Sequence, residues 1–231
     1  MGINMKKPSR KNIRPQLIAM GRHLVYSEGT KTEPYYVSNL ATHIKKDISN
    51  RNVLICKKFS KTSHTLALIS KVETDIEKER RNGRCIDGVW ILFDKDSFDD
   101  FDEATATIES KNFMKNMDGI YGDEYGTVGH SCYSNECFEV WPYLHYEDLV
   151  SPISRRLYIQ KIDAFIKSKG FSAHYKKNIK ELYDFLLTHG GNVNKAISLA
   201  KKKDVGKGNK KINPSTAIYE LVSFFMAYFD K

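Results

Sequence analysis

The sequence predicts an α/β fold with about four mainly parallel strands flanked by helices, followed by a helical C-terminal region. Short apolar runs alternate with segments of helical spacing over roughly the first 130 residues. That alternation is typical of strand–helix–strand units with right-handed crossovers. One run, Val89–Phe93, is continuously apolar, as expected for a strand covered on both faces. After about residue 135 only helical patterns follow.

The elements of the α/β part follow from local signals. Apolar runs predict strands over residues 23–27, 53–56, 89–93 and 125–131. The first helix is expected over residues 34–44, since Pro34 is tolerated in a first turn. A second helix is expected between an N-cap at Ser63 and a stop at Gly83, and a third from Phe101 to Ile108.

The remaining chain predicts helices over residues 135–145, 157–166 and 179–187, one capped by Asn192, and a last one starting at Pro214. Pro142 is expected to kink the first of these or end it early. The predicted organisation is a basic N-terminal arm over residues 1–20, an α/β domain over 21–149 and a helical region over 150–231.

Composition points to a polyanionic partner. The chain has 231 residues, 41% of them apolar, and a formal net charge of +9. Positive charge favours nucleic acid, although soluble proteins can be basic without binding it. No apolar run approaches the ~20 residues of a membrane span. With four cysteines in no zinc-like spacing, free thiols and a cytoplasmic location are expected.

Two basic segments are candidates for phosphate contact. One is the N-terminal arm, which has no apolar signal-peptide core. The other is a glycine-interrupted lysine loop, which is either a nucleic-acid contact or an exposed linker. Its basic residues are Lys201, Lys202, Lys203, Lys207, Lys210 and Lys211.

Acidic residues follow two of the predicted strands. Glu28 ends the first strand, and Asp94 and Asp96 end the strand that begins at Val89. Because the carboxyl ends of parallel strands bind ligands, these carboxylates are expected to converge on one or two hard cations such as Mg²⁺ or Mn²⁺. The alternative is a pair of ordinary acidic turns.

A third motif spans residues 134–146 and is dense in aromatic side chains. Phe138 and Trp141 are expected to belong to the core. Glu139 is harder to explain as a core residue, because a glutamate among aromatics needs a metal or a cationic partner. His145 is either a general acid/base or phosphate ligand, or a structural hydrogen-bonding residue.

Taken together, the three motifs resemble the RloB-like family, whose core is similar to a Toprim domain. The resemblance covers about residues 22–147 and extends more loosely to Tyr175, Lys177 and Pro214. The sequence departs from the family at Glu136, where a proline is usual. It implies a metal site at Glu28, Asp94 and Asp96, kinship with OLD-type nucleases, and a role in prokaryotic antiphage defence by abortive infection. An AAA-type ATPase partner is also implied.

The resulting hypothesis is a Mg²⁺- or Mn²⁺-dependent nuclease. Glu28 would be either a general base or the ligand of a second metal, and Asp94 and Asp96 would be metal ligands. Glu33 and Glu139 would complete or orient the site, and Lys31 or Lys95 would neutralise charge on phosphate. The alternative is a non-catalytic module that binds nucleic acid or senses an ATPase partner. Whether the substrate is DNA or RNA, tRNA included, and whether the chain forms a homo-oligomer are left open.

Overall fold

The computed structural model describes most of the chain. The described residues are 20–45, 53–56, 65–84, 86–95, 101–109, 127–204 and 212–229. Ser63, Asp96, Lys207, Lys210, Lys211 and nearly all of the N-terminal arm therefore lie outside the described residues.

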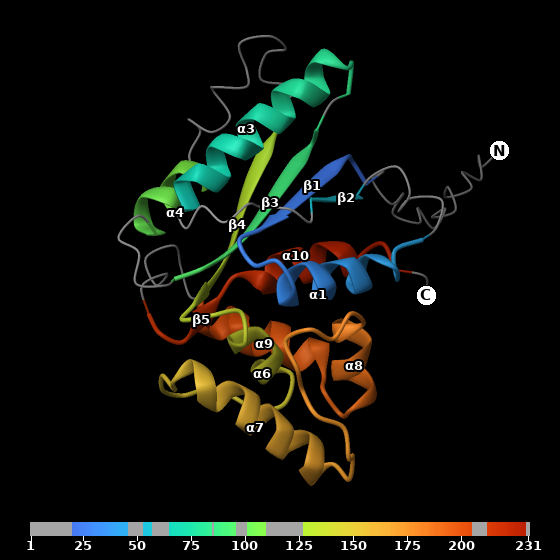
Figure 1. Cartoon of the computed structure of the whole chain (residues 1–231), viewed down its shortest axis with the longest axis vertical. Helices are drawn as coiled ribbons and strands as arrows, with labels where there is room; N and C mark the ends of the chain where they lie inside the picture. The colour runs from blue at the N-terminus through green and yellow to red at the C-terminus, as the bar shows by residue number, and fades with distance from the viewer. Residues whose placement is uncertain are drawn as a thin grey trace, which may run out of the picture.

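The α/β prediction is confirmed by the sheet (Figure 1). Its strand order is β2-β1-β3-β4-β5, with β1 to β4 parallel and β5 antiparallel to β4. The strands are β1 (His23–Ser27), β2 (Val53–Cys56), β3 (Gly88–Asp94), β4 (Val128–Asn135) and β5 (Ser215–Thr216).

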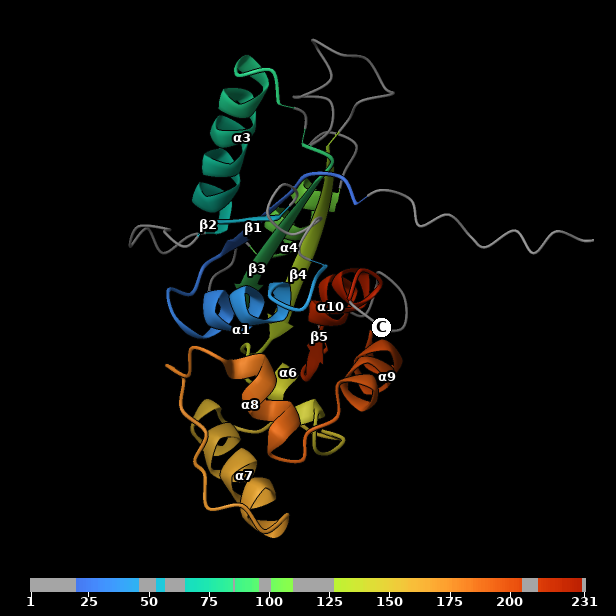
Figure 2. The same cartoon turned by 90° about the vertical axis from the view of Figure 1, so that its right-hand side faces the viewer.

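Helices cover both faces of the sheet. They are α1 (Thr32–Ala41), α3 (Thr65–Arg81), α4 (Phe101–Glu109), α6 (Val140–Leu144), α7 (Arg155–Ser168), α8 (Leu182–Thr188), α9 (Val193–Lys203) and α10 (Ile218–Met226). In Figures 1 and 2, α3 and α4 lie on one face, α1 and α10 lie on the other, and α6 to α9 form a further layer beyond α1 and α10.

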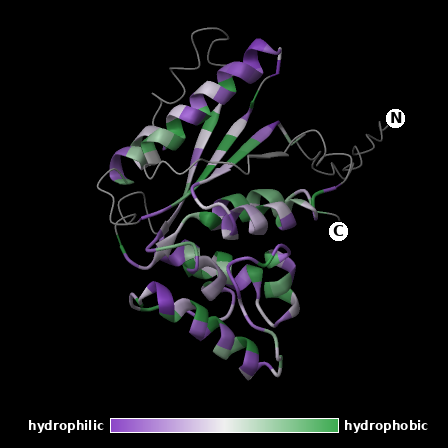
Figure 3. Ribbon diagram, viewed as in Figure 1, coloured by the Kyte–Doolittle hydropathy of each residue, from purple (hydrophilic) through white to green (hydrophobic). Residues whose placement is uncertain are grey.

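The central strands are buried on both faces because their side chains alternate between two cores. Val25 and Leu92 face the core made with α1, α10 and the C-terminal helices, whereas Leu24 and Ile91 face α3 and α4. Along α3 and α7, Figure 3 shows hydrophilic and hydrophobic residues mixed, as expected for helices with one buried face. The first core joins residues on both sides of position 149, and a domain boundary there stays a prediction.

The predicted limits around β4 were wrong. The strand was expected over residues 125–131 and a helix over 135–145, but β4 continues to Asn135 and α6 covers only Val140–Leu144. Pairing with β3 up to Ser134 and with β5 at Asn135 holds this segment extended despite its helical spacing. Pro142 therefore lies in the first turn of α6, where its missing N–H costs little.

Three other helix limits also differ from the prediction. α1 begins at Thr32 rather than Pro34. α8 covers Leu182–Thr188, so it begins three residues later and ends one residue later than the predicted helix over 179–187. A helix was expected to start at Pro214, but residues 215–216 form β5 and α10 begins at Ile218. A two-residue strand carries no periodicity of its own, so only its partner β4 defines it.

None of the described helices has the length and apolar character needed to span a bilayer.

The predicted cap at Asn192 is confirmed, and it gives a first testable expectation. Its side chain accepts a hydrogen bond from the backbone N–H of Lys195 at 2.9 Å. Asn192→Ala is expected to lower the free energy of unfolding by ~1 kcal/mol, because an N–H at the helix start loses its partner. Urea unfolding measures the change. Asn194→Ala, inside the same helix, is the matched control, and an equal loss there would contradict the capping role.

Candidate active site

The predicted meeting of Glu28 and Asp94 is present in the structure. β1 and β3 are neighbours, with Ser27 opposite Leu92. The backbone N–H of Glu28 donates to the carbonyl of Leu92 at 2.9 Å. In return, the backbone N–H of Asp94 donates to Oε2 of Glu28 at 3.4 Å. The Glu28 carboxylate therefore lies against the end of β3, next to the backbone of Asp94.

A pocket of about 250 Å³ opens at these strand ends. It is enclosed by the turn after β1, the start of α1, the end of β3, the segment before α6 and a loop between α7 and α8. The lining residues are Gly29, Thr30, Lys31, Thr32, Glu33, Asp94, Phe138, Glu139 and Lys177. Of the predicted site residues, Lys31, Glu33, Asp94 and Glu139 thus share one pocket, next to Glu28.

Glu33 packs directly over Gly29. A Cβ atom added at Gly29 would lie 2.1 Å from Oε2 of Glu33, closer than any real contact. A side chain at position 29 would therefore displace the Glu33 carboxylate from its place against the end of β1. Ser27 supports the turn by donating from Oγ to the carbonyl of Gly29 at 2.6 Å.

Glu139 is the most buried carboxylate of the pocket, at 2% exposure. Its partner is Lys177, whose Nζ lies 2.8 Å from Oε1 of Glu139. Burial alone would lower the pKa of Lys177, but the hydrogen bond and negative charge of Glu139 outweigh it and the pKa is raised. Thr32 Oγ1 donates to the carbonyl of Lys177 at 2.9 Å, which fixes this loop against α1.

Arg155, at the start of α7, provides a second cation. Its Nη2 lies 3.5 Å from Oδ2 of Asp94 and donates to the carbonyl of Glu136 at 3.0 Å. The arginine thereby joins the end of β3 to the segment that follows β4. Two cations from the C-terminal helical region therefore reach the carboxylates of the α/β part.

The prediction from sequence gave no role to Arg155 or Lys177. Lys177 was noted only as a loose family match, and its place in the chain, 145 residues after Thr32, carries no local signal. Arg155 had no signal beyond its position at the start of an amphipathic helix. A basic residue there is ordinary, so the sequence alone does not single it out.

The structure does not bring His145 to the pocket. Its side chain is fully buried, its ring packs edge-on against Trp141 at 5.4 Å, and neither ring nitrogen has a hydrogen-bond partner among the described residues. Burial lowers the pKa of His145 to about 3, so the imidazole is neutral at physiological pH. Phe138 and Trp141 belong to the same core, as expected.

The other predicted lysines that the structure describes, Lys95, Lys201, Lys202 and Lys203, are not among the residues that line the pocket. Lys95 places its Nζ over the ring of Phe101, 5.1 Å from the centroid. At the end of α9, Lys203 donates to the carbonyl of Leu149 at 2.6 Å, and Lys201 lies over the ring of Tyr219. These contacts involve Lys95, Lys201 and Lys203 only, and phosphate contact by any of the predicted lysines stays a prediction.

The donor set suits a hard cation. Glu28 and Asp94 bring carboxylates to the ends of adjacent strands, and magnesium commonly binds through one or two carboxylates together with water. Within the described ranges, no three histidine, cysteine, aspartate or glutamate side chains are grouped closely enough to form a complete metal cage. Asp96, the third predicted ligand, lies outside those ranges. The arrangement thus fits a metal held by few protein ligands.

Burial of the Glu33 carboxyl predicts a pH dependence of stability. Burial raises the pKa of the Glu33 carboxyl to about 7, and the charges of Glu139 and Glu28 act in the same direction while Lys177 opposes them. The folded protein therefore keeps a proton that the unfolded chain has lost between about pH 4.5 and 7. The contribution of Glu33 to the free energy of unfolding is fully present below about pH 4.5 and is lost as the pH rises to about 7.

Glu33→Gln removes this titration and keeps the side-chain shape. Without added metal, the variant is expected to gain ~1–3 kcal/mol of unfolding free energy relative to the parent between pH 4.5 and 8. Urea unfolding across that range measures it, with Glu103→Gln on the exposed side of α4 as control. A parent and a Glu33→Gln variant with parallel pH profiles would contradict the assignment.

A comparison with protein families finds one match. A family model described as RloB-like protein matches residues 23–225, which includes every described residue of the pocket. No curated protein and no solved structure matches the chain.

Proposed function

The chain belongs to the RloB-like family, and from that premise we propose that it is a metal-dependent nuclease that hydrolyses phosphodiester bonds in nucleic acid. The observation that carries the proposal is the convergence of Glu28 and Asp94 at the carboxyl ends of adjacent parallel strands. Two cations, Lys177 and Arg155, stand beside them. Metal-dependent hydrolysis of a phosphodiester needs carboxylates that bind the metal and cationic side chains that bind the phosphate.

Each residue has a proposed role. Glu28, Asp94 and, further along the chain, Asp96 would hold Mg²⁺ or Mn²⁺. When bound, such an ion supplies Lewis-acid stabilisation of charge on the phosphate. Lys177 and the exposed Lys31 would contact the phosphate that enters the pocket.

Two carboxylates would serve the chemistry without binding the ion directly. Glu33, with its pKa raised to about 7, is suited to accept a proton from an attacking water near neutral pH. Glu139 would orient Lys177 through their 2.8 Å contact. His145 is left out of the mechanism, because it is fully buried away from the pocket.

The substrate class follows from charge. The net charge of +9 favours a polyanion, and the pocket is open enough to admit a phosphate group of a chain. DNA and RNA, including tRNA, are both substrates to be tested. As part of the same proposal, the activity serves prokaryotic antiphage defence by abortive infection, through the Toprim-like chemistry that the family resemblance implies.

The test uses the purified full chain and labelled tRNA, single strands and duplexes. Each substrate is incubated with Mg²⁺, Mn²⁺ or a chelator, and Mg²⁺ binding is measured separately by calorimetry. The proposal expects binding of the ion and cleavage that a chelator stops. Absence of both, at millimolar Mg²⁺ and Mn²⁺, would overturn it.

The alternative is a non-catalytic module that binds nucleic acid or an AAA-type ATPase partner. It expects salt-dependent binding with no need for a divalent ion. A chain that binds Mg²⁺ but cleaves only when co-expressed with such an ATPase would support a partner-controlled nuclease. The calorimetric measurement separates these cases, because it reports on the metal site whether or not cleavage occurs.

A further inference from the structure

The segment from Arg155 to Glu181 carries much of the positive charge of the chain. It contains eight lysines and arginines and two acidic residues, a difference of six charges, whereas the net charge of the whole chain is +9. The segment comprises α7 and the loop that leads to α8. In Figures 1 and 2, α7 lies at the end of the molecule opposite α3. The charge is therefore concentrated at one end of the structure.

α7 presents cations on the face opposite its buried one. Tyr158, Ile162 and Ile166 are buried in the core. Arg156 and Lys167 are exposed and stand eleven positions apart, which is three turns of helix, so they share a face and lie ~16 Å apart along its axis. Because the core covers the apolar face, α7 does not have that face available for a membrane surface, as a free amphipathic helix would.

The loop after α7 adds a third cation beside this face. Oδ1 of Asp163 accepts a hydrogen bond from the backbone N–H of Tyr175 at 2.6 Å, which holds the loop against α7. The next residue, Lys176, is exposed, and Lys177 after it lines the pocket of the candidate active site. Exposed cations therefore continue from α7 to that pocket. We call Arg156, Lys167 and Lys176 together the α7 face.

Surface cations are often neutralised by neighbouring acids, and α3 has that arrangement. It contains four basic and four acidic residues, and Lys71 and Arg81 are each paired with an acid one helical turn away. In the segment that contains α7, the ion pairs among the described residues are those of Arg155, His174 and Lys177. The cations of the α7 face are not part of them, so their charge is directed to solvent.

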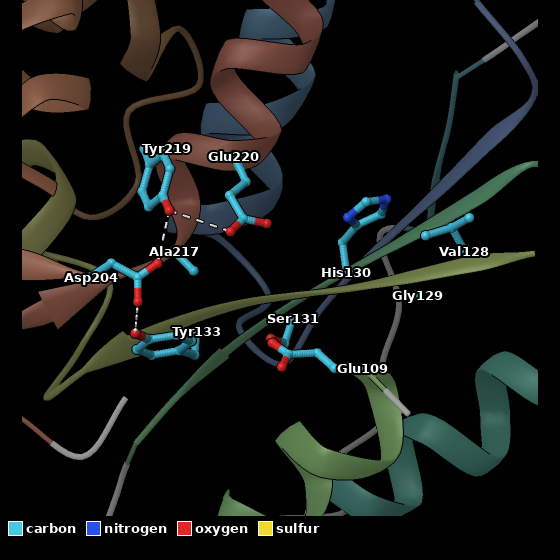
Figure 4. Close-up of a pocket in the computed structure, with 10 residues that line it drawn as sticks. All are labelled: Glu109, Val128, Gly129, His130, Ser131, Tyr133, Asp204, Ala217, Tyr219 and Glu220. Carbon is cyan, nitrogen blue, oxygen red and sulfur yellow. Dashed lines mark hydrogen bonds between the residues drawn. The ribbon is translucent and has the colours of Figure 1, made fainter. Parts of the chain in front are cut away.

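A pocket of about 400 Å³ along β4 has no such cations to offer to a phosphate (Figure 4). Among the described residues that line it there is no lysine or arginine. Its histidine, His130, stacks on Trp90 at 3.8 Å, and burial lowers the pKa of the imidazole, which is therefore neutral at physiological pH. Its Asp204 accepts hydrogen bonds from the hydroxyls of Tyr133 at 2.8 Å and Tyr219 at 2.9 Å. The α7 face is thus better suited than this pocket to bind a polyanion.

We propose that nucleic acid binds along the α7 face, so that its backbone phosphates contact Arg156, Lys167 and Lys176 and one strand reaches the candidate active site at Lys177. The inference rests on the proposed function in taking nucleic acid as the ligand, and it adds the surface that holds the substrate outside the pocket. Phosphates of one strand of a duplex are about 3.4 Å apart along its axis, so the ~16 Å between the two positions on α7 spans about five of them. Binding of this kind is electrostatic and needs no metal ion.

The test measures binding of the full chain to a fluorescent single strand and a fluorescent duplex, each of about 16 nucleotides per strand. EDTA is present throughout, so that cleavage does not interfere. The variant R156Q/K167Q/K176Q removes the three charges of the α7 face. The matched control K71Q/K78Q/R81Q removes three exposed cations from α3 and therefore has the same net charge.

The variant of the α7 face is expected to bind at least ~10-fold more weakly than the parent at low salt, with either form of nucleic acid. The slope of log affinity against log salt concentration should fall by ~2–3, because each phosphate contact contributes about 0.7–0.9. The control is expected to keep the parental slope. K167E alone, a single exposed substitution, should also weaken binding, and it keeps the test decisive if the triple variant does not fold.

Three outcomes would overturn the proposal. One is an equal loss of binding in the variant and the control, since binding would then depend on net charge and not on the α7 face. Another is a parent that binds neither nucleic acid, and the third is a parent that binds only vesicles of anionic phospholipid. A parent that binds through the α7 face in EDTA, but neither binds Mg²⁺ nor cleaves when Mg²⁺ is supplied, would instead overturn the proposed function and support this inference.

Discussion

Asp94→Ala is expected to lower metal-dependent cleavage by at least ~100-fold. Asp94 is the described carboxylate that both lines the pocket and touches Glu28, through its own backbone N–H at 3.4 Å. Its loss removes a proposed metal ligand and leaves Arg155, 3.5 Å away, without one of its acidic partners. Charge stabilisation at a reacting phosphate commonly contributes effects of this size.

Glu28→Ala is expected to act in the same way, and calorimetry should show weaker Mg²⁺ binding for both variants. Glu103→Ala, an exposed carboxylate on α4, is the control for the loss of one negative charge. Because Asp94 is partly exposed, the variant should remain folded, which circular dichroism and urea unfolding would verify. Parental cleavage and parental Mg²⁺ affinity in both folded variants would remove the mechanism proposed for this site.

The pairing of Glu28 with Asp94 was predictable because it depends on strong signals. The apolar runs that precede them are buried strands, with Leu92 and Val25 both about fully covered. Parallel strands of one sheet end at the same edge, so a carboxylate that follows each strand must lie near the other. Their separation of 66 positions along the chain does not matter once β1 and β3 are known to be neighbours.

The positions of the two cations, Arg155 and Lys177, were not predictable, because they depend on tertiary packing and not on local sequence signals. Arg155 and Lys177 reach the pocket from the C-terminal helical region. They are brought there by the packing of α7 against α6, and of α8 and the loop before it against α1. Nothing in the local sequence of either residue depends on that packing. The fit of β5 against Asn135 is a similar case, since two residues become a strand only through their partner.

Helical spacing also misled where aromatic side chains are dense. His145 has the spacing of a helix-face residue with Trp141, which is compatible with both a site residue and a core residue. The structure places it in the core, with no described hydrogen-bond partner for its ring. Spacing reports which residues share a face, and the face itself is assigned only by what packs against it.

Lys177→Met is the second substitution with a large expected effect, and here both stability and activity should change. Glu139 is 3% exposed in its side chain, and Lys177 is its close cationic partner. Removal of the lysine leaves a buried carboxylate without its ion pair, which is costly, although the half-exposed position of Lys177 reduces the cost. The free energy of unfolding is expected to fall by ~1–3 kcal/mol in metal-free buffer.

A double variant separates the charge effect from packing. In Lys177→Met/Glu139→Gln neither charge remains, so most of the lost stability is expected to return, and the two single substitutions should be non-additive by ~1 kcal/mol or more. Cleavage should not return, because the proposed phosphate contact is still absent. Lys180→Met, in the same loop but exposed, is the matched control. Additive changes in the free energy of unfolding would show that Lys177 and Glu139 contribute to stability independently. Full cleavage by a folded Lys177→Met variant would show that Lys177 does not contact the phosphate. The unfolding data would still decide its structural role.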